Sequence, residues 1–220
     1  MSLSLVHSRA LLGLEARPVC VEVHLANGLP SFTLVGLAET EVKEARERVR
    51  SAIQNTGLEF PANKRITVNL APADLPKDSG RFDLPIALGI LAASGQLEAR
   101  KLEGYEFAGE LSLGGDLRPV RGALAMSLAL AHRARKSGEG QPKLVLPEGS
   151  AQEAALVPEA EIYRAHHLLD VVRQFLPGDG AAELLDGWTR IEPITTQHPP
   201  DYPDLADVKE IGRASCRERV

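Results

Sequence analysis

The chain has 220 residues, of which 44% are hydrophobic and 25% charged, which suits a globular domain and excludes a disordered or collagen-like chain. Lys and Arg number 25 against 30 Asp and Glu, so the net charge of -5 excludes binding of nucleic acid through bulk charge and leaves only local contacts. The two cysteines, Cys20 and Cys216, are too few for a disulfide framework, and no apolar stretch reaches the roughly 18 residues of a membrane span. We therefore expect a cytoplasmic protein that does not cross a membrane.

The first part of the chain is predicted to be an antiparallel meander followed by a helix. Residues 18–25 alternate between apolar and polar side chains, and the Asn27-Gly28 dipeptide after them is typical of a tight hairpin. Apolar residues then recur at helical spacing, and Glu-Lys and Glu-Arg pairs four residues apart support a helix. The expected elements are strands over 2–16, 18–25, 31–36 and 65–70 and a helix from about 40 to 55.

The second part is predicted to alternate helices with short strands. Residues 83–93 carry an acid and a proline in their first turn and are then apolar nearly all round, so this helix should be buried. Strands crowded together first and then alternating with helices favour an α/β or α+β domain with helices packed on one mixed sheet. The remaining expected elements are a strand pair over 107–113 and 117–120, strands over 143–146 and 161–165, and helices over 122–136, 149–156 and 168–175.

From residue 177 onward, glycines and prolines interrupt every pattern. We expect residues 1–176 to form the domain and residues 177–209 to be a linker with a short helix near 181–186. Residues 210–220 resemble the translation of a sequencing-library adapter, so we expect them to be non-native and the native protein to continue.

No nucleotide or metal site is expected within the chain. No GxxxxGK[ST] loop occurs, and no GxGxxG follows a predicted strand. Of the six histidines only His166 and His167 are adjacent, and neighbouring side chains point apart on a helix or strand. We therefore expect no catalytic, cofactor-binding or metal-ligating residue here.

A polar loop ahead of the buried helix, residues 76–85, is a candidate binding segment because it places several charges beside an apolar helix. The alternative is structural: Asp83 caps the helix, and Arg81 pairs with a neighbouring acid. The mixed charges of residues 39–50 are interpreted as a solvated helix face rather than a DNA groove.

Five blocks of sequence are diagnostic together: residues 28–37 (GLPSFTLVGL), 42–50 (VKEARERVR), 60–61 (FP), 65–75 (RITVNLAPADL) and 82–91 (FDLPIALGIL). In this order they resemble one known family, the YifB/ComM magnesium-chelatase-like AAA+ ATPases. The resemblance is to their N-terminal domain and covers about residues 1–209, the last of which resemble the segment leading into the ATPase module. It implies the fold of the Lon protease proteolytic domain, related to ribosomal protein S5 domain 2.

For the full-length protein the resemblance implies a homo-hexamer formed through a missing AAA+ module, ATP and Mg as cofactors, and a DNA helicase that promotes branch migration in natural transformation. Phosphate contacts need local cations even on an acidic protein. The candidates for DNA contact are Lys64, Arg65, Lys77 and Arg81. The alternatives are a magnesium chelatase-like or ATP-dependent protease-like subunit and a stand-alone interaction module.

The protease alternative can be tested on the sequence, because a Ser-Lys peptidase needs a serine nucleophile and a lysine base. Alignment with the Lon motifs places Arg81 at the serine position and Met126 at the lysine position. Ser79 lies near the first position, but the helix expected over 122–136 has no lysine in its first three turns. The resemblance therefore implies a Lon-like fold without peptidase activity.

Overall fold

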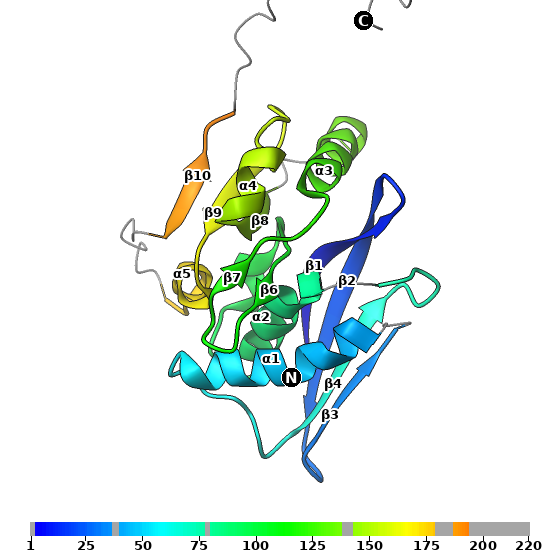
Figure 1. Ribbon diagram of the computed structural model, residues 1–220. Coiled ribbons are helices and arrows are strands. Elements are labelled where there is room, and N and C mark those ends of the chain that lie inside the picture. The colour runs from blue at the N-terminus through cyan, green and yellow to red at the C-terminus, as the bar shows by residue number, and fades with distance from the viewer. Residues whose placement is uncertain (1–2, 37–39, 78–79, 138–142, 179–186, 194–220) are drawn as a thin grey trace, which may run out of the picture.

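A mixed sheet forms the centre of the structure (Figure 1). The computed structural model describes residues 3–36, 40–77, 80–137, 143–178 and 187–193, and within these ranges eight strands follow the order β10-β9-β8-β5-β1-β2-β4-β3. The strands β6 and β7 form a separate pair. The expected α/β class with helices packed on one mixed sheet is confirmed. The strands are β1 Leu3–Leu12, β2 Glu15–Ala26, β3 Ser31–Val35, β4 Arg65–Ala71, β5 Tyr105–Phe107, β6 Glu110–Leu111, β7 Leu117–Arg118, β8 Lys143–Pro147, β9 Glu161–Ala165 and β10 Trp188–Ile191.

The predicted pairing of β2 with β3 is wrong. β4 lies between them, antiparallel to β2 and parallel to β3, and the tight hairpin of this region is formed by β1 and β2. The reason is burial. Ile66, Val68 and Leu70 of β4 are buried and suit a central strand, whereas every residue of β3 is at least partly exposed, as expected at a sheet edge.

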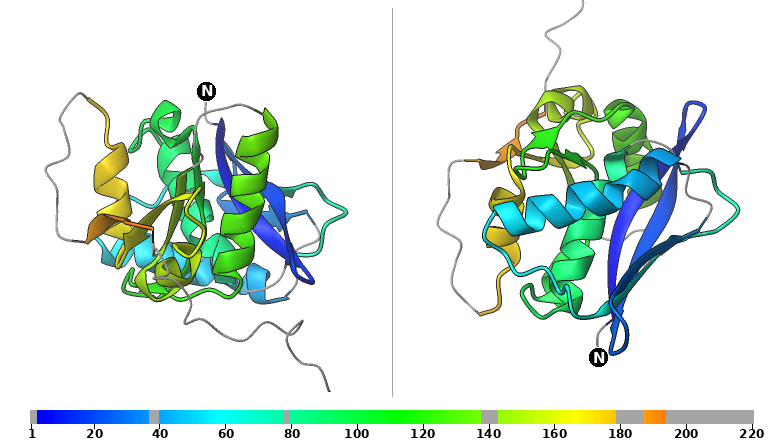
Figure 2. Two further views of the ribbon diagram at one scale, coloured as in Figure 1. Left: turned by 90° about the horizontal axis from the view of Figure 1, so that it is seen from above. Right: turned by 60° about the horizontal axis from the view of Figure 1, so that its bottom comes forward.

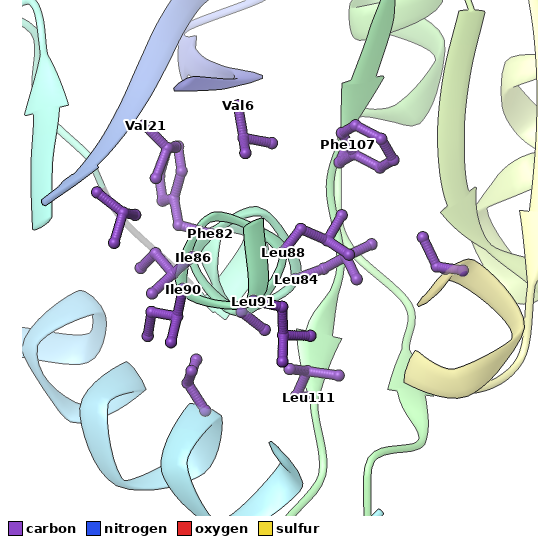
Figure 3. Packing of buried hydrophobic residues seen from close by; sticks show 14 of the residues in the cluster. Val6, Val21, Phe82, Leu84, Ile86, Leu88, Ile90, Leu91, Phe107 and Leu111 are labelled. Atoms are coloured by element: carbon purple, nitrogen blue, oxygen red, sulfur yellow. The ribbon is translucent and has the colours of Figure 1, made fainter. Parts of the chain in front are cut away.

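Helix α2 occupies the middle of the main hydrophobic core, and Figure 3 shows its side chains between those of the strands and of α1. Every residue from Asp83 to Leu91 is buried, which confirms the prediction for this helix. Gly89 lets α2 approach β2, because a Cβ atom there would lie 2.5 Å from Cγ2 of Val23. No helix in the described ranges is both long and apolar enough to span a bilayer. The helices are α1 Thr40–Asn55, α2 Asp83–Ala93, α3 Ala123–Ser137, α4 Glu148–Ala154 and α5 Leu168–Val172, with short 3-10 turns η1 Gly80–Phe82, η2 Ala99–Leu102 and η3 Arg173–Phe175.

Two hydrophobic clusters lie on opposite faces of the sheet. Alternate residues of β8 show this: Val145 belongs to the main cluster with α1, α2 and α5, while Leu144 and Leu146 belong to a second cluster with α3 and α4. At the start of β1 the second face is open, where Leu3 and Leu5 are exposed. The sheet is therefore covered on both faces at β8 and on one face where β1 begins.

The sheet is nearly interrupted between β1 and β5, which pair only through His7 and Glu106. A buried ion pair reinforces this seam: Nε and Nη2 of Arg9 lie 2.6 and 3.0 Å from the two carboxylate oxygens of Glu106. Arg9 also donates to the carbonyl of Ala16, and Arg133 of α3 reaches Glu106 at 3.2 Å. Side chains thus supply much of the connection that backbone pairing leaves out.

β10 extends the sheet beyond residue 176, where we expected a linker without strands. It pairs with β9, and its Trp188 is only 9% exposed. The indole stacks on Tyr163 with ring centroids 4.9 Å apart and meets the ring of Phe175 edge-on at 5.9 Å. This aromatic packing holds residues 188–191 on the domain. The boundary at 177 stays a prediction, and the short helix expected near 181–186 falls outside the described residues, as do residues 194–220.

Candidate nucleic-acid interface

A groove between α1 and the first residues of β3 and β4 combines cations with aromatic rings. It encloses about 200 Å³. Figure 2 shows α1, which forms one wall, lying across the front of the molecule in the right-hand view. We call it the Lys64 groove. The side chains that give it its chemistry are Phe32, Arg46, Glu47, Arg50, Phe60 and Lys64.

The orientation of α1 follows from its apolar face. Ala45, Val49 and Ile53 recur at helical spacing and are fully buried in the main core. Arg46 and Arg50 are four residues apart, so they lie on a common side of the helix and both line the groove. Burial of one face of α1 therefore presents the two guanidinium groups together.

Two aromatic rings form the apolar part of the groove. Phe32 and Phe60 are half-buried, pack against the main core, and have ring centroids 6.4 Å apart. The guanidinium carbon of Arg50 lies 5.7 Å from the centroid of Phe60, a distance at which a cation is attracted to the face of an aromatic ring. The positions of both rings are thus fixed by the core, and the ring of Phe60 holds Arg50 at the groove.

Lys64 is placed by a tight turn just before β4. The amide of Lys64 donates to the carbonyl of Pro61 at 3.1 Å, and its Nζ donates to Oδ1 of Asn27 at 2.7 Å. A second hollow of about 600 Å³ adjoins the groove and is lined by polar residues such as His24, Asn27, Glu59 and Gln96. Pro61 and Lys64 line both hollows, so the two adjoin at Lys64.

The groove carries a local excess of positive charge on an acidic protein. Arg46, Arg50 and Lys64 face a single carboxylate, Glu47. Nε of Arg46 lies 3.1 Å from Oε1 of Glu47, but both side chains are more than half exposed, so this pair is weak and exchanges readily with solvent. The arrangement is suited to anionic ligands with an apolar or aromatic part.

The structure does not bring the four predicted DNA-contact residues into one site. Lys64 lines the groove. Arg65 is exposed beside it but is not part of the lining, and its guanidinium lies near Gly28. Lys77 and Arg81 are 0% and 2% exposed, so this conformation does not present them to a phosphate.

The buried positions of Lys77 and Arg81 are explained by backbone carbonyls. Nζ of Lys77 donates to the carbonyl of Pro72, and Nη1 of Arg81 donates to that of Arg121 at 3.2 Å. Burial lowers the pKa of Lys77, and the nearby charge of Asp74 offsets part of this effect. The loop is therefore a packed segment where residues 76–77 and 80–85 are described, while Ser79 falls outside the described residues.

Asp83 does not cap α2, contrary to the structural alternative for this loop. The N-cap residue is Phe82, and the Asp83 carboxylate instead accepts from Nε and Nη2 of Arg48 at 2.6 and 3.1 Å and from the amide of Leu111 at 3.1 Å. Burial raises its pKa to about 6, and the contacts with Arg48 and Leu111 limit that rise. Arg48, expected on a solvated helix face, therefore joins α1 to α2.

The two positions aligned with the Lon serine and lysine hold groups that cannot perform that chemistry. Arg81 has no hydroxyl, and it is held at the loop before α3 through the Arg121 carbonyl. Met126 is fully buried in the second cluster, and a thioether cannot act as a base in place of an amine.

Sequence reasoning missed Arg46, Arg50, Phe32 and Phe60. The available signal was the i, i+4 spacing of two arginines on a helix whose apolar face was already predicted. Near balance of charge along residues 39–50 obscured it, because a sum along the chain does not separate one side of the helix from another.

Comparisons with known proteins show what the chain is similar to. The family described as subunit ChlI of Mg-chelatase matches residues 21–149. The competence protein ComM of Haemophilus influenzae is 56% identical over 81% of the chain and 33% of its own length, and the uncharacterized protein YifB of Escherichia coli is 54% identical over 83% and 34%. An uncharacterized protein of Mycobacterium bovis is 36% identical over 100% of the chain and 41% of its own length. The chain thus spans about a third of the ComM and YifB relatives, and it belongs to the magnesium-chelatase-like ChlI family that includes ComM and YifB.

Proposed function

We propose that the protein is a DNA-dependent AAA+ ATPase that acts as a helicase and branch-migration factor in natural transformation, and that the chain described here is its N-terminal domain. The observation that carries the proposal is the 56% identity to a relative named competence protein ComM. The groove of cations and aromatic rings at Lys64 supports a DNA-handling role for this domain.

ATP and Mg would be bound outside this chain. The sequence has no GxxxxGK[ST] loop, and the described residues contain no group of three or more His, Cys, Asp and Glu side chains that could hold a metal ion. The residues present do not fit the nucleotide, so the domain would contribute through contacts with DNA or with other subunits of a homo-hexamer in the cytoplasm.

The domain is proposed to have no peptidase activity. Arg81 and Met126 stand where the Lon resemblance requires serine and lysine, which supports a Lon-like fold that does not hydrolyse peptide bonds.

The test is an ATPase assay of the full-length protein with and without DNA, together with strand displacement and migration of a synthetic four-way junction. We expect hydrolysis to be stimulated by DNA and junction migration to require ATP. An ATP hydrolysis rate that is the same with and without DNA, together with no strand displacement, would contradict the proposal. Casein digestion lost on the S79A substitution would contradict the non-peptidase assignment.

A further inference from the structure

The Lys64 groove has no assigned ligand, and its chemistry indicates one. We propose that it binds single-stranded DNA, with backbone phosphates at Arg46, Arg50 and Lys64 and an unstacked base against Phe32 and Phe60. This inference rests on the proposed function, because it assigns a DNA contact to one domain of a DNA-dependent motor.

The cations are available to an anion. Lys64 donates to the neutral amide oxygen of Asn27, which leaves its charge uncompensated, and Arg50 lies over the ring of Phe60. Within the described part of the chain, neither side chain has a carboxylate within ion-pair distance. Phosphate oxygens can therefore accept from both groups without breaking an existing ion pair.

The aromatic rings favour a single strand over a duplex. Phe32 and Phe60 are half-buried and pack against the main core, so they are held in place before any ligand arrives. In a duplex both faces of each base are covered by its neighbours, whereas a single strand offers free faces for stacking on such rings. Cations alone would bind either form.

The adjoining hollow favours a polymer over a free nucleotide. The groove of about 200 Å³ meets the polar hollow of about 600 Å³ at Pro61 and Lys64. A strand whose phosphate contacts Lys64 can therefore continue on both sides of it, which a mononucleotide does not require.

The experiment compares full-length variants for binding to fluorescein-labelled oligothymidylate and to a duplex of equal length, by fluorescence anisotropy across a salt series. The groove variant carries R46A, R50A and K64A. Its control carries R17A, R118A and R190A, which remove the same charge from exposed arginines that lie in surface ion pairs on other elements. A second variant, F60L, keeps an apolar side chain but removes the ring.

Each lost phosphate contact lowers the slope of log affinity against log salt by about 0.7, or affinity about fivefold near 0.1 M salt. We therefore expect the groove variant to bind single strands on the order of 100-fold more weakly than the control. F60L should weaken single-strand binding about fivefold, leaving the salt slope and duplex binding unchanged.

The outcomes separate this inference from the function on which it rests. If the wild type binds DNA and the groove variant matches the control in affinity and slope, the groove is not the site, and the proposed function stands. If F60L has no effect, or weakens duplex binding equally, base stacking at Phe60 is refuted. If the wild-type protein binds no DNA, both proposals fail.

Discussion

The ion pair between Arg48 of α1 and buried Asp83 of α2 makes the free energy of unfolding depend on pH. The R48M substitution tests this dependence. The pKa of Asp83 rises from 3.8 to about 6 on folding, chiefly because the carboxyl is buried. Two pKa units correspond to about 3 kcal/mol. Because the folded state binds the proton more tightly, this contribution to stability is full below about pH 4 and is lost as pH rises to about 6.

Removing Arg48 leaves the ionised carboxylate buried without its partner, since Asp83 is fully buried and Arg48 is the cation that contacts it. We expect R48M to lower the free energy of unfolding by about 3–5 kcal/mol near pH 8. Near pH 5 the loss should be much smaller, because folded Asp83 is then largely protonated. The pKa of Asp83 should rise further, so the fall in stability extends to higher pH.

The assay is urea unfolding followed by the fluorescence of Trp188, the single tryptophan of the chain. The matched control is R46M on the same helix, whose exposed ion pair with Glu47 predicts a loss below about 1 kcal/mol at either pH. Equal destabilisation by R48M near pH 5 and pH 8 would refute the reasoning, because it would show that Asp83 does not titrate between them.

Two further predictions concern the sheet. W188A should lower the free energy of unfolding by about 3–5 kcal/mol, because it removes a buried ring that packs on Tyr105, Tyr163 and Phe175. L176A, at an exposed site, should change it by less than about 0.5 kcal/mol. Calorimetry compares the two variants, and similar losses would contradict the packing role of β10. R9M should lower the free energy of unfolding by about 3 kcal/mol, since it removes the bidentate partner of buried Glu106. R133M, at a half-exposed side chain, should lower it by less than about 1 kcal/mol. Urea titration measures both losses, and a larger loss for R133M would contradict the role given to Arg9 between β1 and β5.

The sequence predicts the elements of this fold better than their pairing. The buried helix at 83–93 and the strand at 161–165 are visible because local apolar patterns suffice. The position of β3 at the edge follows from β4 taking the central place, where it pairs with a strand along each of its edges. The position of β10 depends on contacts of Trp188 with aromatic rings of other elements. Asn27-Gly28 marks a change of direction but does not determine which strand pairs next.

The candidate site shows the same division. Lys64, Arg65, Lys77 and Arg81 were chosen from the sequence only as local cations, and their role in DNA contact stays a prediction. The sequence could not show that Lys77 and Arg81 are buried, since only tertiary packing reveals that they donate to backbone carbonyls. Phe60 gave no signal by itself. Its role emerges only when the turn at 60–64 carries it beneath α1 and next to Phe32.

The single residue pair between β1 and β5 is the smallest backbone connection between neighbouring strands of the eight-stranded sheet. The main hydrophobic core nevertheless crosses this seam, since Val6 and Val21 on one side and Phe107 and Val145 on the other belong to the same cluster. The two groups of strands, β10-β9-β8-β5 and β1-β2-β4-β3, are therefore joined chiefly by side chains, namely this shared core and the buried Arg9–Glu106 ion pair. The continuity of the sheet thus depends on tertiary packing more than on its backbone ladder.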